Sequence, residues 1–144
     1  MLYVATALRG LDPQLERRVR QHRERRPAEW GMLELGGGDL GTALEGTERW
    51  GAVLLDSLTL WVSARMLEGE KEEATLQGFD RFLDGAIALP TPFVLVSDEV
   101  GLGVVPGSGK GRSFRDVLGL VNQRAATAAE EVSLCVAGFG VRIK

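Results

Sequence analysis

The sequence offers little for covalent or metal cross-links, since it contains one cysteine and one histidine among its 144 residues. A single thiol cannot form an internal disulfide, and Cys135 lies in the apolar run VSLCVAG, which favours a reduced setting. Long apolar runs are also missing, because none approaches the roughly 20 residues that span a bilayer, and no signal peptide is evident. We therefore expect a cytoplasmic protein without a membrane span.

A large excess of one charge is missing too, since the formal net charge is -3, but the charges are unevenly placed. Glu68, Glu70, Glu72 and Glu73 form an acidic middle. Arginines crowd the beginning of the chain, at Arg9, Arg17, Arg18, Arg20, Arg23, Arg25 and Arg26. This arginine cluster indicates a local phosphate-bearing partner, whereas the overall balance argues against a general nucleic-acid-binding protein.

Short apolar runs recur along the chain and alternate with helical patterns. The runs LYVATA, AVLLD, PFVLVSDE and VSLCVAG are continuously apolar, which is typical of strands buried on both faces of a sheet. The alternation predicts one α/β domain over residues 1–144, with a mostly parallel sheet and helices on both faces. The predicted helices, the first opened by an Asp12-Pro13 cap, lie at about 12–26, 39–49, 57–67, 72–88 and 112–130.

Two glycine-rich stretches resemble nucleotide-binding loops, and both are incomplete. In VVPGSGKGRSFRD, at 104–116, a phosphate loop requires glycine where Val104 stands and serine or threonine where Gly111 stands. The stretch GGGDLG at 36–41 has the spacing of a dinucleotide motif but follows only the short MLEL, so an NAD-binding domain is the weakest alternative. The simpler interpretation is a turn into a helix capped by Asp39.

Polar residues follow several of the predicted strands, at the sheet edge where open parallel sheets bind ligands. Thr6 ends LYVAT, Asp56 ends AVLLD, and Asp98 with Glu99 end FVLVSDE. A carboxylate in this place is suited to Mg²⁺, which prefers a few hard oxygen ligands together with phosphate. Asp56 is equally well explained as the N-cap of the helix at 57–67, and both interpretations stay open.

The single histidine, His22, lies within the arginine cluster. A lone histidine on a charged helix face is more often exposed and without function. Here Arg18, Arg25 and Arg26 can lie within a turn of it and lower the pKa of its imidazole by repulsion between like charges. A neutral imidazole beside arginines that bind phosphate oxygens is suited to attack a phosphorus atom.

The segments YVATA, RRVRQHRERRPAEW, LLDSLTLWV, LVSDEVGLGVVP, FRDVLGLVNQR and EVSLCVAGFGVRIK occur in this order from Leu2 to Lys144. Together they closely resemble the bifunctional adenosylcobinamide kinase and adenosylcobinamide-phosphate guanylyltransferase family of cobalamin biosynthesis. The resemblance implies a RecA-like fold of the P-loop NTPase type. It also implies phosphorylation of adenosylcobinamide, followed by transfer of GMP from GTP to that phosphate with release of pyrophosphate.

The resemblance implies that His22, in the motif R-[IV]-x-x-H-R, carries GMP as a covalent phosphoramidate. It implies GTP, ATP and Mg²⁺ as ligands, with the phosphate donor of the kinase step left open, and a homotrimer. Asp56 matches the acidic nucleotide and magnesium position. Glu34 matches a nucleotide-contacting glutamate, which can accept N–H groups of guanine or bond ribose hydroxyls. The remaining implied GTP-site positions are Thr6, Ala7, Leu8, Arg23, Glu24, Arg25 and Arg26.

One departure from the family is large. The family begins with a strand, a loop of the form G-[GA]-x-x-S-G-K-S and a helix, whereas here Met1 stands directly before the strand that matches LYVATA. Without that loop we expect both reactions to lack their main triphosphate cradle. Since the family's opening strand is internal, its absence predicts exposed apolar surface beside the sheet.

We favour a shortened start over a natural remnant that binds GTP or a corrinoid without catalysis. A remnant has no reason to keep His22, Glu34, Asp56 and Glu99 together. The family comparison also implies that GSGKGRS, at 107–113, is a local loop in which Lys110 has no catalytic part. Asp98 stands where asparagine is common in the family.

Overall fold

The structure is a computed structural model that describes residues 1–8, 10 and 13–144. Within these residues, four parallel strands form a sheet in the order β2-β1-β3-β4. Two more strands, β5 (Ser133–Val136) and β6 (Phe139–Arg142), form a separate antiparallel hairpin. The predicted α/β class with a mostly parallel sheet is confirmed. The four sheet strands are β1 (Leu2–Ala5), β2 (Gly31–Glu34), β3 (Val53–Asp56) and β4 (Phe93–Val96).

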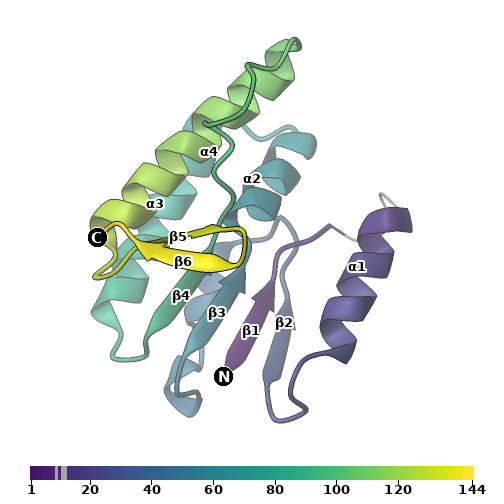
Figure 1. The fold of residues 1–144 in the computed structure, drawn as a ribbon. Coiled ribbons are helices and arrows are strands. Elements are labelled where there is room, and N and C mark those ends of the chain that lie inside the picture. The colour runs from purple at the N-terminus through teal and green to yellow at the C-terminus, as the bar shows by residue number, and fades with distance from the viewer. Residues whose placement is uncertain (9, 11–12) are drawn as a thin grey trace.

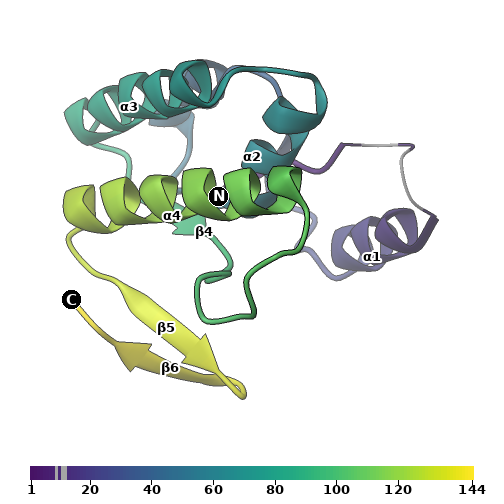
Figure 2. The same ribbon diagram turned by 90° about the horizontal axis from the view of Figure 1, so that it is seen from above.

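Helices connect the parallel strands. In Figure 1 and Figure 2, α2, α3 and α4 are grouped together, whereas α1 stands apart from them beside β2. Among the described residues, no helix has the length and apolar character needed to cross a membrane. The helices are α1 (Pro13–Glu24), α2 (Leu58–Leu67), α3 (Glu72–Ala88) and α4 (Gly109–Ala128), with short 3-10 helices η1 (Leu40–Leu44) and η2 (Thr47–Arg49).

One face of the sheet forms the hydrophobic core. Side chains alternate between the two faces of a strand, and Val4 and Leu55 point to the face that packs against the helices, where both are fully buried. Trp61 of α2 lies with its ring centroid 6.1 Å from that of Phe79, which lies 6.0 Å from Phe82. Burial of these large apolar side chains holds α2 and α3 on the sheet.

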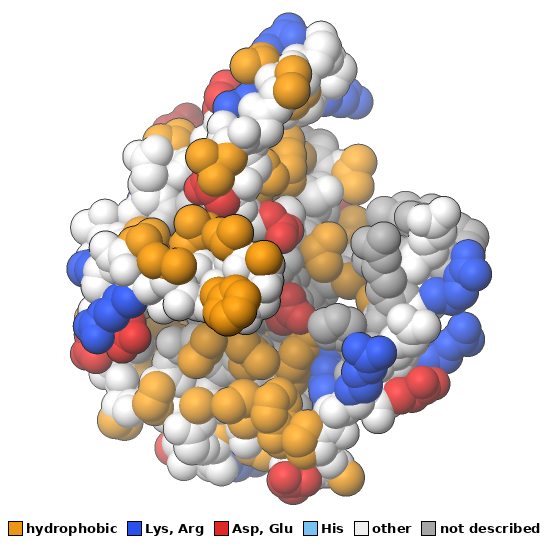
Figure 3. Space-filling model, viewed as in Figure 1, with side chains coloured by type: hydrophobic (Ala, Val, Ile, Leu, Met, Phe, Trp, Pro, Cys, Tyr) orange, Lys and Arg blue, Asp and Glu red, His pale blue; other side chains and the backbone are white. Residues whose placement is uncertain are grey.

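The other face of the sheet is only partly covered. Val94 and Val96 of β4 are 48% and 40% exposed, and Met32 of β2 is 38% exposed. Figure 3 shows a broad apolar area on this side of the molecule, next to the basic side chains of α1. The prediction that the strands are buried on both faces is therefore wrong for β4, and it is also wrong for the VSLCVAG run, because β5 is mostly exposed and Cys135 lies at the surface.

The segment predicted as a helix at 39–49 consists instead of η1 and η2. Asp39 caps η1, as predicted, because its carboxylate accepts a hydrogen bond from the N–H of Gly41 at 3.0 Å. Gly46 then adopts a positive φ of 62°, a conformation that ends a regular helix. The strand β2 was missed because its four residues follow a charged segment and lack a long apolar run.

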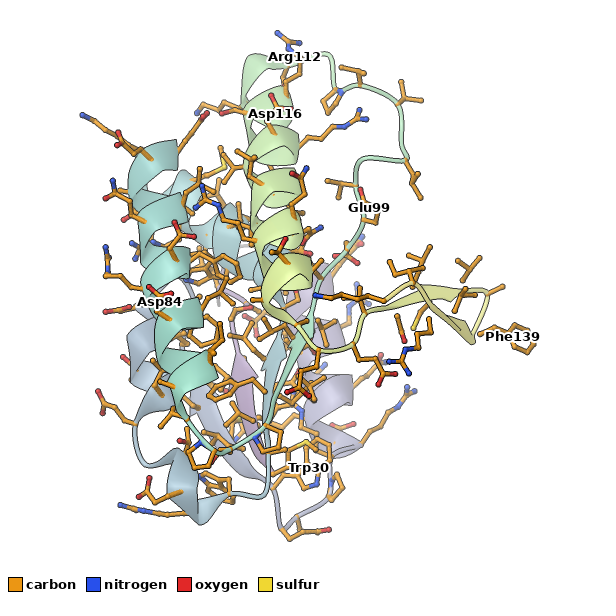
Figure 4. All side chains as sticks on the ribbon, turned by 90° about the vertical axis from the view of Figure 1, so that its left-hand side faces the viewer. Trp30, Asp84, Glu99, Arg112, Asp116 and Phe139 are labelled. Atoms are coloured by element: carbon orange, nitrogen blue, oxygen red, sulfur yellow. The ribbon has the colours of Figure 1, made fainter. Side chains whose placement is uncertain are left out.

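The C-terminal hairpin joins two antiparallel strands through a short turn. Ala137 and Gly138 both have positive φ, of 51° and 84°, as in the two-residue turns that join antiparallel strands. The side chain of Phe139 is 75% exposed, and Figure 4 shows it projecting outward from the hairpin. The hairpin therefore adds little to the core.

The assignment of a covered face and an open face can be tested by the same substitution, valine to alanine, at one position on each face. Val53→Ala, on the covered face, should lower the free energy of unfolding by about 2 kcal/mol, because buried methyl groups are lost and a cavity is left. Val94→Ala, on the open face, should lower it by less than about 1 kcal/mol. Denaturant unfolding measures both changes. Equal losses would contradict the assignment of the faces.

Candidate functional site

The carboxyl ends of β1 and β3 are joined by one threonine. The parallel register pairs Ala5 with Asp56, and the following residue, Thr6, is fully buried. Its hydroxyl donates to the carbonyl of Ser57 and accepts from the Ser57 N–H, both at 2.7 Å. The Thr6 side chain, predicted to form part of the GTP site, is therefore engaged within the fold, where it holds the backbone beside Asp56.

Asp56 lies on the partly open face of the sheet. Tyr3 stands two positions earlier in the register on the same face, and its hydroxyl donates a hydrogen bond to Oδ2 of Asp56. Burial, followed by this hydrogen bond to the carboxylate, raises the pKa of Tyr3 far above its usual value. The phenol therefore stays protonated and holds one carboxylate oxygen in place.

The helix-cap interpretation of Asp56 is wrong. The N-cap of α2 is Ser57, whose hydroxyl accepts a hydrogen bond from the N–H of Leu60 at 3.3 Å. Asp56 is thus free of the capping role, and it is partly buried at the strand end. Among the described residues there is no cluster of three or more metal-ligating side chains, so the assignment of Mg²⁺ to Asp56 stays a prediction.

Arg26 reaches the same face from the segment after α1. Its guanidinium carbon lies 3.4 Å from the centroid of the Tyr3 ring, within the range of a cation–π contact. Its Nη1 lies 3.9 Å from the sulfur of Met32. The Nε of Arg26 is buried and has no hydrogen-bond partner. Arg26, Tyr3 and Asp56 therefore form a continuous chain of contacts from α1 to the strand end.

A second contact connects α1 to the sheet. Arg23 lies with Nη1 3.7 Å from Oε1 of Glu34, the last residue of β2. Both side chains are largely exposed, so this ion pair by itself adds little stability. Glu24 and Arg25, next to Arg23, are exposed. Four of the predicted GTP-site positions therefore lie where α1 approaches the sheet, namely Arg23, Glu34, Glu24 and Arg25.

The predicted nucleophile lies on α1, but its side chain is outside the described part of the structure. The same holds for the side chain of Arg18 and for the predicted Asp12 cap. The cage of arginines around His22 therefore stays a prediction. On the sheet side, Ala7 and Leu8 are partly buried after β1, and Leu8 lies against Gly36 of the neighbouring loop.

The segment after β4 is held by hydrogen bonds to side chains that the sequence motifs do not indicate. The N–H of Asp98 donates to the hydroxyl of Thr59 at 2.8 Å, and the amide of Asn122 donates to the Asp98 carbonyl at 3.1 Å. The carboxylate of Glu99 accepts from the N–H of Gly101 at 2.6 Å. Figure 4 shows Glu99 on this segment, between β4 and α4. Asn122 and Thr59 were missed because their partner lies far away in the sequence.

The stretch GGGDLG forms a loop that packs against α2. The indole N–H of Trp61 donates to the carbonyl of Gly38 at 3.0 Å, and Arg65 donates to the carbonyl of Gly37 at 3.1 Å. A Cβ at Gly37 would lie 3.0 Å from the Cβ of Ala64, closer than side chains normally approach. Glycine thus lets the loop lie against α2, and only the five-residue η1 follows it, which is unlike a dinucleotide-binding helix.

Comparison with known proteins agrees with this geometry. The family model described as cobinamide kinase / cobinamide phosphate guanyltransferase matches residues 1–143. The chain belongs to this family. It is 36% identical to the bifunctional adenosylcobalamin biosynthesis protein CobU of Salmonella typhimurium over 157 residues, which cover 100% of the chain and 86% of that relative.

Two further relatives have similar names. CobU of Escherichia coli is 35% identical over 170 residues, covering 100% of the chain and 86% of that protein. The bifunctional protein CobP of Pseudomonas aeruginosa is 36% identical over 149 residues, covering 99% and 81%. The family consists of transferase enzymes, and the resemblance stated from the motifs is confirmed.

The second glycine-rich stretch of this family member begins a helix. Ser108 is the N-cap of α4, and its hydroxyl accepts a hydrogen bond from the N–H of Gly111 at 3.1 Å. The prediction that 107–113 is entirely a loop is therefore wrong, because the helix begins at Gly109. Lys110 is exposed on the first turn.

Substitutions in this stretch should show whether it caps a helix or binds phosphate. Ser108→Ala should lower the free energy of unfolding by about 1 kcal/mol, because a capping hydrogen bond is lost. Lys110→Ala should leave unfolding almost unchanged, and in a form that carries the family's glycine-rich loop it should change guanylyl transfer by less than about tenfold. Thermal unfolding and transfer assays measure these effects. A larger loss of transfer in Lys110→Ala would show that the lysine contacts the phosphates.

Proposed function

We propose that this chain phosphorylates adenosylcobinamide and then transfers GMP from GTP to the new phosphate, with His22 as the covalent carrier. The observation that supports this proposal best is the approach of the end of α1 to the sheet, through Arg26 on Tyr3 and Arg23 on Glu34. These contacts connect the arginine-rich segment to Tyr3, whose hydroxyl is bonded to Asp56. Cations and a carboxylate are the groups that a magnesium-bound triphosphate requires.

Guanylyl transfer then proceeds in two displacements. In the first, a neutral nitrogen of His22 attacks the α-phosphorus of GTP, a nitrogen–phosphorus bond forms, and the bond to the bridging oxygen breaks as pyrophosphate leaves. In the second, a phosphate oxygen of adenosylcobinamide phosphate attacks the same phosphorus and the imidazole leaves. The arginines of the same segment bind phosphate oxygens and stabilise the charge that develops on them.

Residues of the sheet have distinct parts in this proposal. Asp56 is the residue that would hold Mg²⁺, which when bound neutralises phosphate charge. Glu34 accepts hydrogen bonds from guanine or ribose, in exchange for its contact with Arg23. Thr6 keeps the Asp56 backbone in place. Ala7 and Leu8, which follow it, line the nucleotide site.

The wider proposal follows the family resemblance and the composition. GTP and ATP are the proposed nucleotides, and the kinase step uses the same strand ends, because phosphoryl transfer depends on positioning and charge. A homotrimer in the cytoplasm is proposed as the working form, with the single thiol of Cys135 kept reduced.

The carrier role of His22 can be tested by labelling. With Mg²⁺ and GTP labelled at the α-phosphorus, the protein should acquire label through a bond that is labile in acid and stable in base, as a phosphoramidate is. His22→Ala should abolish both the label and guanylyl transfer, while much of the kinase activity persists. Gln21→Ala, an exposed neighbour on the same helix, is the matched control and should keep the label.

The measurement is made on the 144-residue chain and on a longer form that carries the family's glycine-rich loop ahead of Met1, where stronger labelling is expected. Undiminished transfer by His22→Ala in the longer form would disprove the carrier role. A longer form that binds GTP but is never labelled would favour the non-catalytic binding module instead.

A further inference from the structure

The described polar contacts of α1 lie near its two ends. None of its described side chains is buried. The N–H of Gly10 donates to Oε1 of Glu16 at 2.8 Å near the start of the helix, and the pair of Arg23 with Glu34 is exposed. A 12-residue helix is marginal in water without tertiary contacts. Polar contacts near the end of α1 therefore contribute to holding it in place.

Arg26 is the anchor with the best geometry. Its guanidinium carbon lies over the ring of Tyr3, which is only 5% exposed, so the ring side of the contact is shielded from water. A cation over an aromatic ring gains strength when it is desolvated. The edge of a guanidinium can still donate in its plane while its flat face stacks. The Nε of Arg26 is buried and has no hydrogen-bond partner among the described residues, so stacking on Tyr3 leaves this donor unused.

Tyr3 has a second contact at its other end. Its ring supports Arg26, while its hydroxyl donates to Oδ2 of Asp56. One side chain in the central part of the sheet thus touches both the segment after α1 and the carboxylate at the end of β3. The raised pKa of Tyr3 keeps the hydroxyl proton in place for this bond.

We infer that Tyr3 and Arg26 are positioning residues that couple the helix carrying His22 to the carboxylate of Asp56. The ring of Tyr3 holds Arg26 and thereby the end of α1, and the hydroxyl of Tyr3 holds Asp56 in one rotamer. The catalytic purpose of this coupling rests on the proposed function. The contacts themselves do not depend on it, and they can be tested separately.

The anchor is tested first by backbone hydrogen exchange of the 144-residue chain. Arg26→Gln removes the cation but keeps a polar side chain, and it should speed exchange of the α1 amides by roughly tenfold, with α3 unchanged. Arg17→Gln, at an exposed arginine of the same helix, should leave α1 unchanged. Unchanged α1 exchange in Arg26→Gln would overturn the anchor.

The two functions of Tyr3 are then separated. Tyr3→Phe keeps the ring, so α1 exchange should stay as in the original protein. Tyr3→Leu removes the ring and should speed α1 exchange as Arg26→Gln does, and the two changes combined should add nothing further. Additive effects would show that Arg26 and Tyr3 act independently. Unchanged α3 exchange shows that Tyr3→Leu is still folded, and if it is not, Tyr3→Phe and Arg26→Gln alone decide the outcome.

The bond to Asp56 is tested by a double-mutant cycle and by kinetics. Tyr3→Phe and Asp56→Asn should change thermal unfolding non-additively, because each removes the same hydrogen bond, and additive changes would overturn the contact. In the labelling reaction of the form with the glycine-rich loop, Tyr3→Phe should lower kcat roughly tenfold and leave KM for GTP within twofold, since positioning affects the reaction step.

An equal change of kcat and KM, or no change, would overturn the positioning role of Tyr3. Absence of labelling in the unsubstituted form that carries the glycine-rich loop would overturn the proposed function and the catalytic purpose of the coupling. The exchange and unfolding results would then still report on the contacts, so failure of one conclusion can be distinguished from failure of the other.

Discussion

The parallel pairing of β1 with β3 is the constraint on which the candidate site depends. Its register places Ala5 opposite Asp56, and the reciprocal hydrogen bonds between Thr6 and Ser57 continue the pairing beyond the last strand residues. A slip by one residue would turn Asp56 to the covered face and Leu55 to the open face, because side chains alternate. The register is therefore protected by the hydrophobic core, and the core in turn determines where the carboxylate stands.

The two faces of the sheet are stabilised by different physical interactions. On the covered face, burial of Leu55, Trp61 and Phe79 provides a non-directional driving force that tolerates small shifts. On the open face, α1 is held by an ion pair and by the stacking of Arg26 on Tyr3, which are directional and local.

Sequence patterns predict the elements better than they predict the contacts between them. The apolar runs correctly place β1, β3 and β4, and the periodicity correctly places α1 to α4 within a few residues. Asp56 is found because a carboxylate after a buried strand is conspicuous, but Tyr3 is not, because a tyrosine in an apolar run is usually part of the core. Its contact with Asp56 joins residues 53 positions apart, and this proximity exists only once the parallel register is known. The Glu34 position was found from family resemblance alone, since β2 is as short as the other strands but lacks their continuous apolar run.

Backbone groups of both glycine-rich stretches form hydrogen bonds within the fold. The carbonyls of Gly37 and Gly38 are bonded to α2, and the N–H of Gly111 is bonded to the cap of α4. Backbone N–H groups bind phosphate only when several of them converge and are unpaired. In the described part of the chain, Arg26 contributes a cation beside the sheet, and its Nε is buried without a hydrogen-bond partner. Because that arginine also rests on Tyr3, the arrival of phosphate charge at Arg26 would act on the same ring whose hydroxyl holds Asp56. Anion binding and placement of the carboxylate are thus connected through one aromatic side chain of the central sheet.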